Sequence, residues 1–101
     1  MNHPLVATHQ QTCRAMPDQH EGTLVDGRWF YLRLRWGVAV LGLGDTLDAA
    51  VEDSTGGQSV FVGDSLMGKF ESDGQRDQVF SSLLERAVRA TVDQPKEGDR
   101  G

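Results

Sequence analysis

The sequence predicts an α+β domain, in which a small antiparallel sheet of three to five strands packs against a C-terminal amphipathic helix. Three observations support this fold class. Residues 28–36 alternate between two kinds of side chain, as the two faces of a half-buried strand do. Asp26-Gly27 separates this run from an earlier apolar stretch, which is a hairpin signal. Residues 75–92 carry apolar side chains at helical spacing.

A three-stranded meander is expected over residues 22–43. Its first turn is Asp26-Gly27, because both central positions of a two-residue hairpin need positive φ, which Asp and Gly tolerate. Along the strand 28–36, successive side chains point to opposite faces. The expected core face of this strand holds Phe30, Leu32 and Leu34. The opposite face holds the aromatic and arginine side chains Trp29, Tyr31, Arg33 and Arg35.

The second turn of the meander decides which side chains of the return strand join the core. A two-residue turn at Trp36-Gly37 would hold Trp36 at positive φ, which a bulky residue resists. We therefore predict a three-residue loop over residues 35–37, with Gly37 in the left-handed region. This register places Val38 and Val40 on the core face.

Two shorter elements follow the meander. Asp45 precedes a short helix over residues 46–53, where an acidic side chain caps the backbone and favours the positive end of the helix dipole. Residues 58–62 read as a strand that ends at a Gly-Asp turn. Residues 65–70 form either a return strand or an irregular loop.

The C-terminal helix over residues 75–92 has the clearest periodicity in the chain. Ser72 and Gln75 have the spacing of a capping box at its start. We expect one face of this helix to cover the sheet. The predicted core contains Phe30, Leu32, Leu34, Val40, Val60, Val62, Val79, Phe80, Leu83, Leu84 and Val88.

The chain is expected to form one domain over residues 21–92. Residues 1–20 are polar and rich in His and Gln, so we expect a flexible N-terminal leader. Residues 93–101 are expected to be a disordered tail. Met16 is a second candidate start of translation, which would leave residues 1–15 outside the native protein. A domain of about 70 residues buries only about 60% of its unfolded surface, so a dimer or a bound partner would add stability.

The net charge of −5 is unevenly spread along the chain. Residues 1–44 carry a net charge of +1, whereas residues 45–101 carry −6. An acidic second half disfavours extensive phosphate neutralisation, on which nucleic-acid affinity depends. A broad nucleic-acid wrapping surface is therefore not expected.

Cysteine content and hydropathy indicate a cytoplasmic protein. Cys13 is the one cysteine, so no internal disulfide can form. The N-terminus has neither a basic region nor an apolar stretch of a secretory signal, and no segment has the length of a membrane span. The chain has no isoleucine, and eight arginines stand against two lysines. This usage points to a high-GC genome.

The segment from Gly63 to Lys69 has the spacing of a phosphate-binding P-loop. However, Phe70 stands where the Mg²⁺-binding Ser or Thr is needed, and the segment does not open directly into a helix. A simple turn is the better interpretation, and no cofactor is indicated.

Two sets of residues are candidate metal ligands. The first comprises His3, His9, Cys13 and His20, whose spacings differ from the short paired spacings of structural zinc sites. The second comprises the acidic residues Asp45, Asp48, Glu52 and Asp53, which lack the alternating ligands and central glycine of a calcium loop. The first set is better explained by a flexible leader, and the second by a solvated helix face. No metal site is predicted.

No arrangement of residues typical of an enzyme is found. Ser65 is not in a Gly-x-Ser-x-Gly context, and every histidine precedes the predicted domain. A nucleophile in this domain would therefore have no histidine base, and we predict a protein that is not an enzyme.

The best candidate for a contact surface is the outer face of the long strand. Trp, Tyr and Arg are enriched at binding hot spots. An alternative is that the aromatic side chains merely cover neighbouring residues while the arginines extend past them into water. The predicted partner-binding residues are Trp29, Tyr31, Arg33, Arg35 and Trp36.

These observations favour a non-enzymatic protein-binding or regulatory protein. Its small size, acidity and high-GC coding are compatible with a phage or mobile-element protein that acts on a host protein. The partner is then an unknown protein or a second copy in a homodimer, and no membrane association is expected. A single-stranded nucleic-acid binder that stacks bases on the same surface is an alternative, although less favoured. A homo-oligomeric structural or assembly subunit is another.

Overall fold

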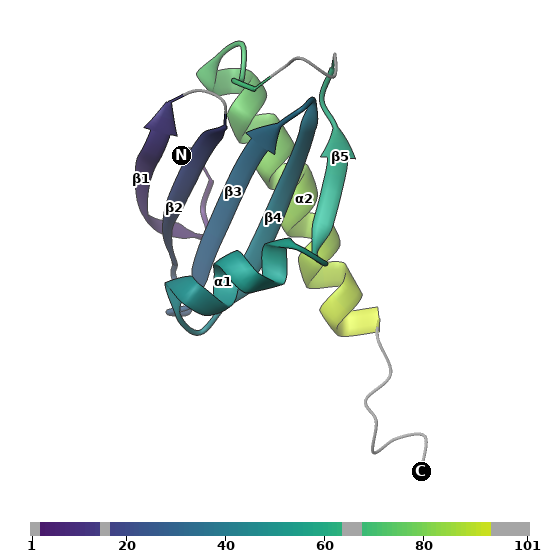
Figure 1. The fold of residues 1–101 in the computed structure, drawn as a ribbon. Coiled ribbons are helices and arrows are strands. Elements are labelled where there is room, and N and C mark those ends of the chain that lie inside the picture. Colours follow the sequence, from purple (N-terminus) through teal and green to yellow (C-terminus); the bar gives the residue numbers. More distant parts are fainter. Residues whose placement is uncertain (1–2, 15–16, 64–67, 94–101) are drawn as a thin grey trace.

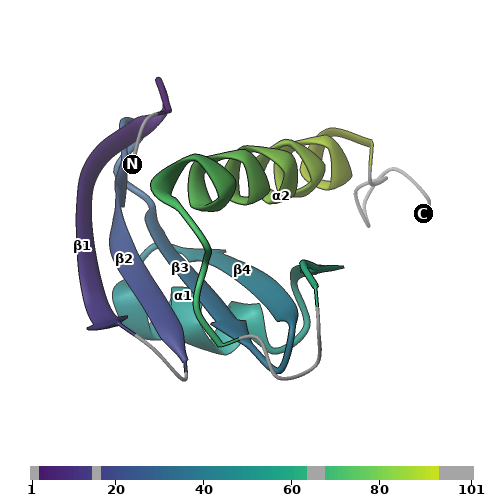
Figure 2. The same cartoon turned by 90° about the horizontal axis from the view of Figure 1, so that it is seen from above.

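The computed structural model of the protein describes residues 3–14, 17–63 and 68–93. One antiparallel sheet contains its strands in sequence order: β1 (Val6–Arg14), β2 (Asp18–Leu24), β3 (Trp29–Arg35), β4 (Val38–Gly44) and β5 (Gln58–Phe61) (Figure 1). Helix α2 (Asp73–Asp93) lies over one face of the sheet, and the shorter α1 (Leu47–Ser54) lies over the other (Figure 2). The structure thus confirms the predicted α+β fold class.

The first strand and part of the second lie where the sequence predicted a flexible leader over residues 1–20. β1 pairs with β2 from Val6 opposite Leu24 to Arg14 opposite Asp18. Alternate residues of β2 are buried, and two of them, Asp18 and His20, are polar. Hydrophobic periodicity misses such a strand because its buried face is partly polar. Met16 and residues 94–101 of the predicted tail lie outside the described residues.

The two-residue turn predicted at Asp26-Gly27 is wrong. The Leu24 N–H donates to the Arg28 carbonyl at 2.7 Å, so the β2–β3 loop has three residues, 25–27, and Gly27 rather than Asp26 is at positive φ.

The three-residue loop predicted between β3 and β4 is also wrong. Arg35 lies opposite Val38, so that Trp36 and Gly37 form a two-residue turn with φ values of 55° and 75°. The cost of positive φ at a bulky residue is about 1–2 kcal/mol. This register buries Leu41 against Leu32, and burial of one leucine contributes about 1.5–3 kcal/mol. Burial therefore outweighs backbone strain.

The core lies between the sheet and α2. Six predicted core side chains, from Phe30, Leu32, Leu34, Phe80, Leu83 and Leu84, are buried, and Val60, Val62 and Val79 pack against them. The register places Val40 on the opposite face, beside Arg33. Val88 is 37% exposed. The prediction of Val40 and Val88 as core residues is therefore wrong, and the buried apolar residues that it omitted are Leu24, Tyr31, Ala39, Leu41, Ala50 and Phe70.

Helix α1 packs closely against β4 on the side away from α2. Thr46 caps it, since its hydroxyl accepts a hydrogen bond from the Ala49 N–H at 3.1 Å. The prediction that Asp45 caps this helix is therefore wrong by one residue. A Cβ atom at Gly42 would collide with the Ala50 carbonyl, so glycine is what allows the helix to approach the strand.

The start of α2 is capped as the sequence predicts. The Ser72 hydroxyl accepts a hydrogen bond from the Gln75 N–H at 3.0 Å. The Gln75 side chain in turn accepts from the Glu71 N–H at 2.7 Å. Before this cap, residues 68–70 are not in a strand, and residues 64–67 lie outside the described part of the chain.

Candidate functional site

The predicted contact face on β3 is divided into two regions by α1. Gly44 and Gly42, over which α1 packs, lie opposite Trp29 and Tyr31. Tyr31 is buried, and its hydroxyl accepts a hydrogen bond from the Gln19 side chain at 2.6 Å. Burial raises the pKa of the Tyr31 hydroxyl. Trp29 is half-buried. This half of the predicted face is therefore largely unavailable to a partner.

The other half of the predicted face is open. Arg33 is half-buried, whereas Arg35 is exposed. The Arg35 guanidinium lies over the Trp36 ring, with its carbon 5.5 Å from the ring centre. This is a cation–π contact, of the kind worth about 0.5–1 kcal/mol at an exposed site. Trp36 is 57% exposed, so the pair presents both an apolar plane and a positive charge to solvent.

A third exposed side chain, Phe61 on β5, was not among the predicted site residues. Phe61 lies opposite Val38, and the next residue, Val62, donates its N–H to the Gly37 carbonyl at 2.8 Å. Phe61 therefore lies at the same end of the sheet as the Trp36 turn, and it is 81% exposed. We define Arg35, Trp36, Val38 and Phe61 as the aromatic corner. Successive side chains of a strand lie on opposite faces, so the predicted core positions of Val60 and Val62 imply that Phe61 lies on the outer face.

Within the described residues, Trp36 is the one non-glycine residue at positive φ. Two-residue hairpin turns of this kind favour Asn-Gly or Asp-Gly. A bulky aromatic residue there is strained, and such strain is concentrated at functional sites. The same side chain is one of the most exposed large apolar groups of the described chain.

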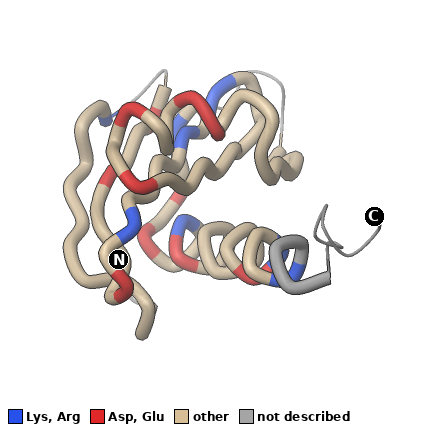
Figure 3. Tube along the Cα trace, turned by 90° about the horizontal axis from the view of Figure 1, so that it is seen from below, with Lys and Arg blue, Asp and Glu red and all other residues tan. Residues whose placement is uncertain are grey.

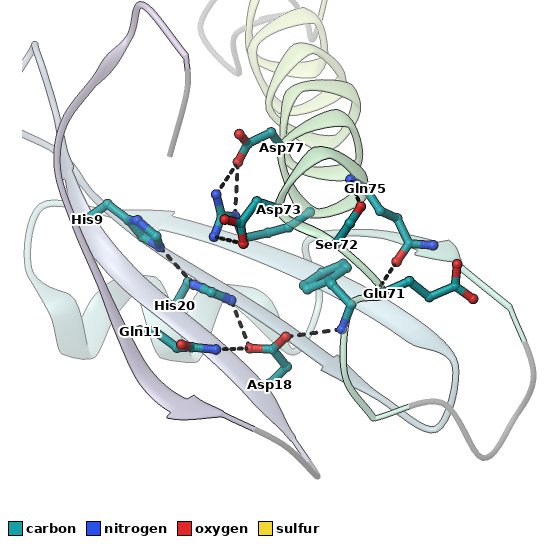
Figure 4. Close-up of polar contacts among 11 residues, drawn as sticks. His9, Gln11, Asp18, His20, Glu71, Ser72, Asp73, Gln75 and Asp77 are labelled. Carbon is teal, nitrogen blue, oxygen red and sulfur yellow. Dashed lines mark hydrogen bonds and ion pairs between the residues drawn. The ribbon is translucent and has the colours of Figure 1, made fainter.

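A second cluster of polar side chains connects β1 and β2 to the segment before α2 (Figure 4). The His9 Nε2 and His20 Nδ1 atoms are 2.8 Å apart, and the His20 Nε2 atom lies 2.8 Å from an Asp18 carboxylate oxygen. Asp18 also accepts hydrogen bonds from the Gln11 side chain at 2.9 Å and from the Phe70 N–H at 3.1 Å. Asp18 and His20 are buried, His9 is half-buried and Gln11 is exposed, and we call these four residues the buried polar network after its two central members.

The contact between His20 and Asp18 is close but lacks hydrogen-bond geometry. The His20 Nε2 atom has no partner with hydrogen-bond geometry, although Asp18 lies within ion-pair distance. Burial lowers the pKa of His20, and the nearby Asp18 charge opposes this shift. Burial also lowers the pKa of His9 to about 4, and the nearby Arg76 charge acts in the same direction. Both histidines are therefore neutral near pH 7.

A cavity of about 300 Å³ lies beside this network. Asp18, His20, Arg14, Lys69 and Arg76 are among its lining residues, so its walls carry both signs of charge. Arg76 is engaged by Asp73 at 3.2 Å and Asp77 at 2.8 Å. The Ser72 hydroxyl is committed to the helix cap. The network is therefore better explained as polar packing that holds β1, β2 and the start of α2 together.

The structure unites two members of the histidine and cysteine set, His9 and His20. The His3 ring packs edge-on against Phe80, with ring centres 5.8 Å apart. Over the described residues, no group of three or more His, Cys, Asp or Glu side chains is arranged to hold a metal ion.

In the acidic set, Asp53 accepts a hydrogen bond from the Leu43 N–H at 2.9 Å and so attaches α1 to β4. Asp45, Asp48 and Glu52 are exposed at or near α1, and Figure 3 shows acidic positions gathered along this part of the chain. Part of the P-loop-like segment, residues 64–67, lies outside the description.

Comparisons of the chain with protein-family models, with curated proteins and with solved structures found no match. In the described part of the chain, neither α1 nor α2 combines the length and hydropathy needed to cross a membrane. The fold and the site define a small α+β protein with an exposed aromatic corner at one end of its sheet. What it does must therefore be inferred from its geometry alone.

Proposed function

We propose that this chain is a non-enzymatic protein-binding protein of a regulatory kind, which contacts its partner through the aromatic corner. The observation that carries this proposal is Trp36, held at φ 55° with 57% of its surface exposed. Asn or Gly would fit this turn with less strain. A contribution to binding explains why the position holds tryptophan.

The chemistry of the aromatic corner supports protein recognition. Tryptophan and arginine are the side chains most enriched at binding hot spots, and Phe61 adds a large apolar surface beside them. Burying Phe61 against a partner would contribute about 1.5–3 kcal/mol. Arg35 can meet a carboxylate on the rim of such a contact while its guanidinium stays over Trp36.

The same surface is less suited to stacking the bases of a single nucleic-acid strand. Tyr31 is buried and Trp29 half-buried, so two of the three aromatic side chains on the predicted face are withheld. Trp36 and Phe61 remain as stacking groups, with Arg35 and the half-buried Arg33 as the nearest positive charges on β3. A stacking platform needs a track of positive charge for the phosphates.

We further propose that the partner is a host protein in the cytoplasm, as for a phage product.

Affinity capture from an extract of the source organism tests the proposal. We expect Trp36→Asn and Phe61→Ser each to lose the partners that the wild type retains. The matched control is Val25→Ser, because Val25 is 62% exposed in the β2–β3 turn, outside the aromatic corner. Equal capture by all four proteins would refute the assigned surface. Captured nucleic acid that dissociates steeply with salt would replace protein binding by the nucleic-acid alternative.

A further inference from the structure

We infer that the aromatic corner's partner is a second copy of this chain, which pairs antiparallel along the free edge of β5. This inference rests on the proposed protein-binding function and names its partner. Among the described residues, the strand order places β5 at one end of the sheet, with β4 as its one neighbour (Figure 1).

The backbone of β5 offers hydrogen-bonding groups to such a partner. Val62 donates its N–H toward β4, to the Gly37 carbonyl. The backbone N–H and C=O groups of successive residues in an antiparallel strand point alternately to the two sides. Those of Val60 therefore also point toward β4, whereas those of Ser59 and Phe61 point away from it. The Arg86 side chain agrees with this assignment, since it donates to the Ser59 carbonyl at 3.1 Å. That carbonyl has a second lone pair, so it still has capacity to accept from another strand.

The residues of β5 itself lack the features that usually prevent pairing between sheets, although the Arg86 side chain of α2 contacts the outward edge. The sequence of β5 is Gln58-Ser-Val-Phe61, with neither a charged residue nor a proline. Natural edge strands are commonly protected by lysine, proline, a bulge or an inward-pointing charge. The net charge of −5 is therefore not concentrated along this edge, and two copies can approach there.

A two-fold axis that passes through Val60 perpendicular to the sheet pairs the outward backbone hydrogen-bonding groups of the two β5 strands with each other. It sets Ser59 of each copy opposite Phe61 of the other, and each such pair exchanges two backbone hydrogen bonds. Both α2 helices then lie on one face of the joined sheet, and both aromatic corners lie on the other. The two Phe61 side chains become diagonal neighbours, within reach of each other.

The size of this contact predicts a weak dimer. A four-residue edge with Phe61 offers less than the about 800 Å² per partner of a standard stable interface. We therefore expect a dissociation constant on the order of micromolar to hundreds of micromolar. Because each chain carries a charge of −5, added salt is expected to strengthen the dimer by screening repulsion.

Sedimentation equilibrium across a concentration series of the full chain tests this inference. A reducing agent is included, so that no Cys13 disulfide mimics association. Ser59→Pro removes an outward N–H and leaves the inward bonds of β5 to β4, so we expect it to raise the dissociation constant at least tenfold. Ser59→Ala keeps that N–H and is the matched control, expected to dimerise as the wild type does. Circular dichroism and melting temperature establish that both variants are folded.

The outcomes separate this inference from the proposed function. A wild type that stays monomeric at millimolar concentration would overturn the second copy as partner. So would a folded Ser59→Pro protein that dimerises like the wild type. If the wild type is monomeric yet captures another protein in a manner that depends on Trp36 and Phe61, the proposed function stands and this inference fails. A dimer that is weakened by Phe61→Ser and also by Ser59→Pro supports both the proposed function and this inference.

Discussion

The imidazole rings of His9 and His20 meet through a 2.8 Å contact between Nε2 and Nδ1, which connects the edge strand β1 to the buried polar network. One of these two nitrogens must donate and the other accept, so the contact needs at least one ring that is neutral. Full protonation of both rings would set two N–H groups against each other. The pairing of β1 with β2 is thus coupled to the protonation of the half-buried His9 and the buried His20.

Stability is expected to fall as the pH is lowered through the range between about 6.5 and 4. The pKa of His9 is lowered from 6.5 to about 4, and that of His20 is also lowered, mainly by burial. The unfolded chain therefore binds protons at a higher pH than the folded chain, so the stabilisation is complete above pH 6.5 and is lost below it.

Urea denaturation at pH 7.0, 5.5 and 4.5 measures this dependence. His9→Gln is expected to flatten it, because one titrating group is removed. His3→Gln is the control, since His3 lies outside the buried polar network and contacts Phe80. An unchanged slope in His9→Gln would show that this contact does not govern acid stability.

Asp18→Ala is expected to destabilise the protein. Asp18 is buried, and it accepts hydrogen bonds from Gln11 and Phe70. Leaving a buried donor unpaired costs about 1–3 kcal/mol, so we expect the free energy of unfolding to fall by at least this amount. Glu52→Ala, on the exposed side of α1, should change it by no more than about 0.5 kcal/mol. Equal effects of the two substitutions would argue against a structural role for Asp18.

Gly42→Ala is expected to displace α1 from the sheet. The added Cβ would meet the Ala50 carbonyl and the Ser54 backbone, neither of which can move without shifting the helix. Overpacking of this kind costs about 1–3 kcal/mol. Gly56→Ala is a matched control, because nothing lies within 4 Å of a Cβ at that position. Thermal melting should therefore distinguish the two variants, and similar melting temperatures would contradict the close approach of α1 to β4.

Trp36→Asn is expected to make the protein more stable while it weakens partner binding. Asn relieves the strain of a bulky residue at φ 55°, which amounts to about 1–2 kcal/mol, less the cation–π contact with Arg35. Denaturant unfolding measures the gain. Arg35→Gln is a useful comparison, because it removes the cation–π contact without changing the turn. A Trp36→Asn protein that is less stable than the wild type would show that Trp36 is required by the fold.

Leu83→Ala is expected to cost about 2–5 kcal/mol, because Leu83 is buried in the core between α2 and the sheet. Val88→Ala, five residues further along the same helix and 37% exposed, should cost far less. Chemical denaturation of both variants compares the buried and exposed sides of α2 directly. Comparable losses at the two positions would contradict the packing described here.

The candidate site was only partly predictable from the sequence. Alternation in β3 identified Arg35 and its neighbours as an outward face, and the structure leaves Arg35 and Trp36 exposed there. Sequence could not show that α1 folds back over Tyr31, because that contact depends on Gly42 and on the path of the chain after β4. Phe61 joined the site only when β5 was placed beside β4.

Local physics determined much of this protein directly from its sequence. The alternation in β3 and the capped amphipathic helix α2 each follow from interactions between residues close together in the chain, so periodicity and capping chemistry reveal them. Turn chemistry placed a hairpin at Asp26-Gly27 but gave the wrong loop length, because Leu24 pairs with Arg28 around three residues. Tertiary structure decided what involves distant partners. The β3–β4 register strains Trp36 because a buried Leu41 is worth more than a relaxed turn. The polar start of the chain becomes strands because Asp18 and His20 find partners there that the sequence alone does not place beside them.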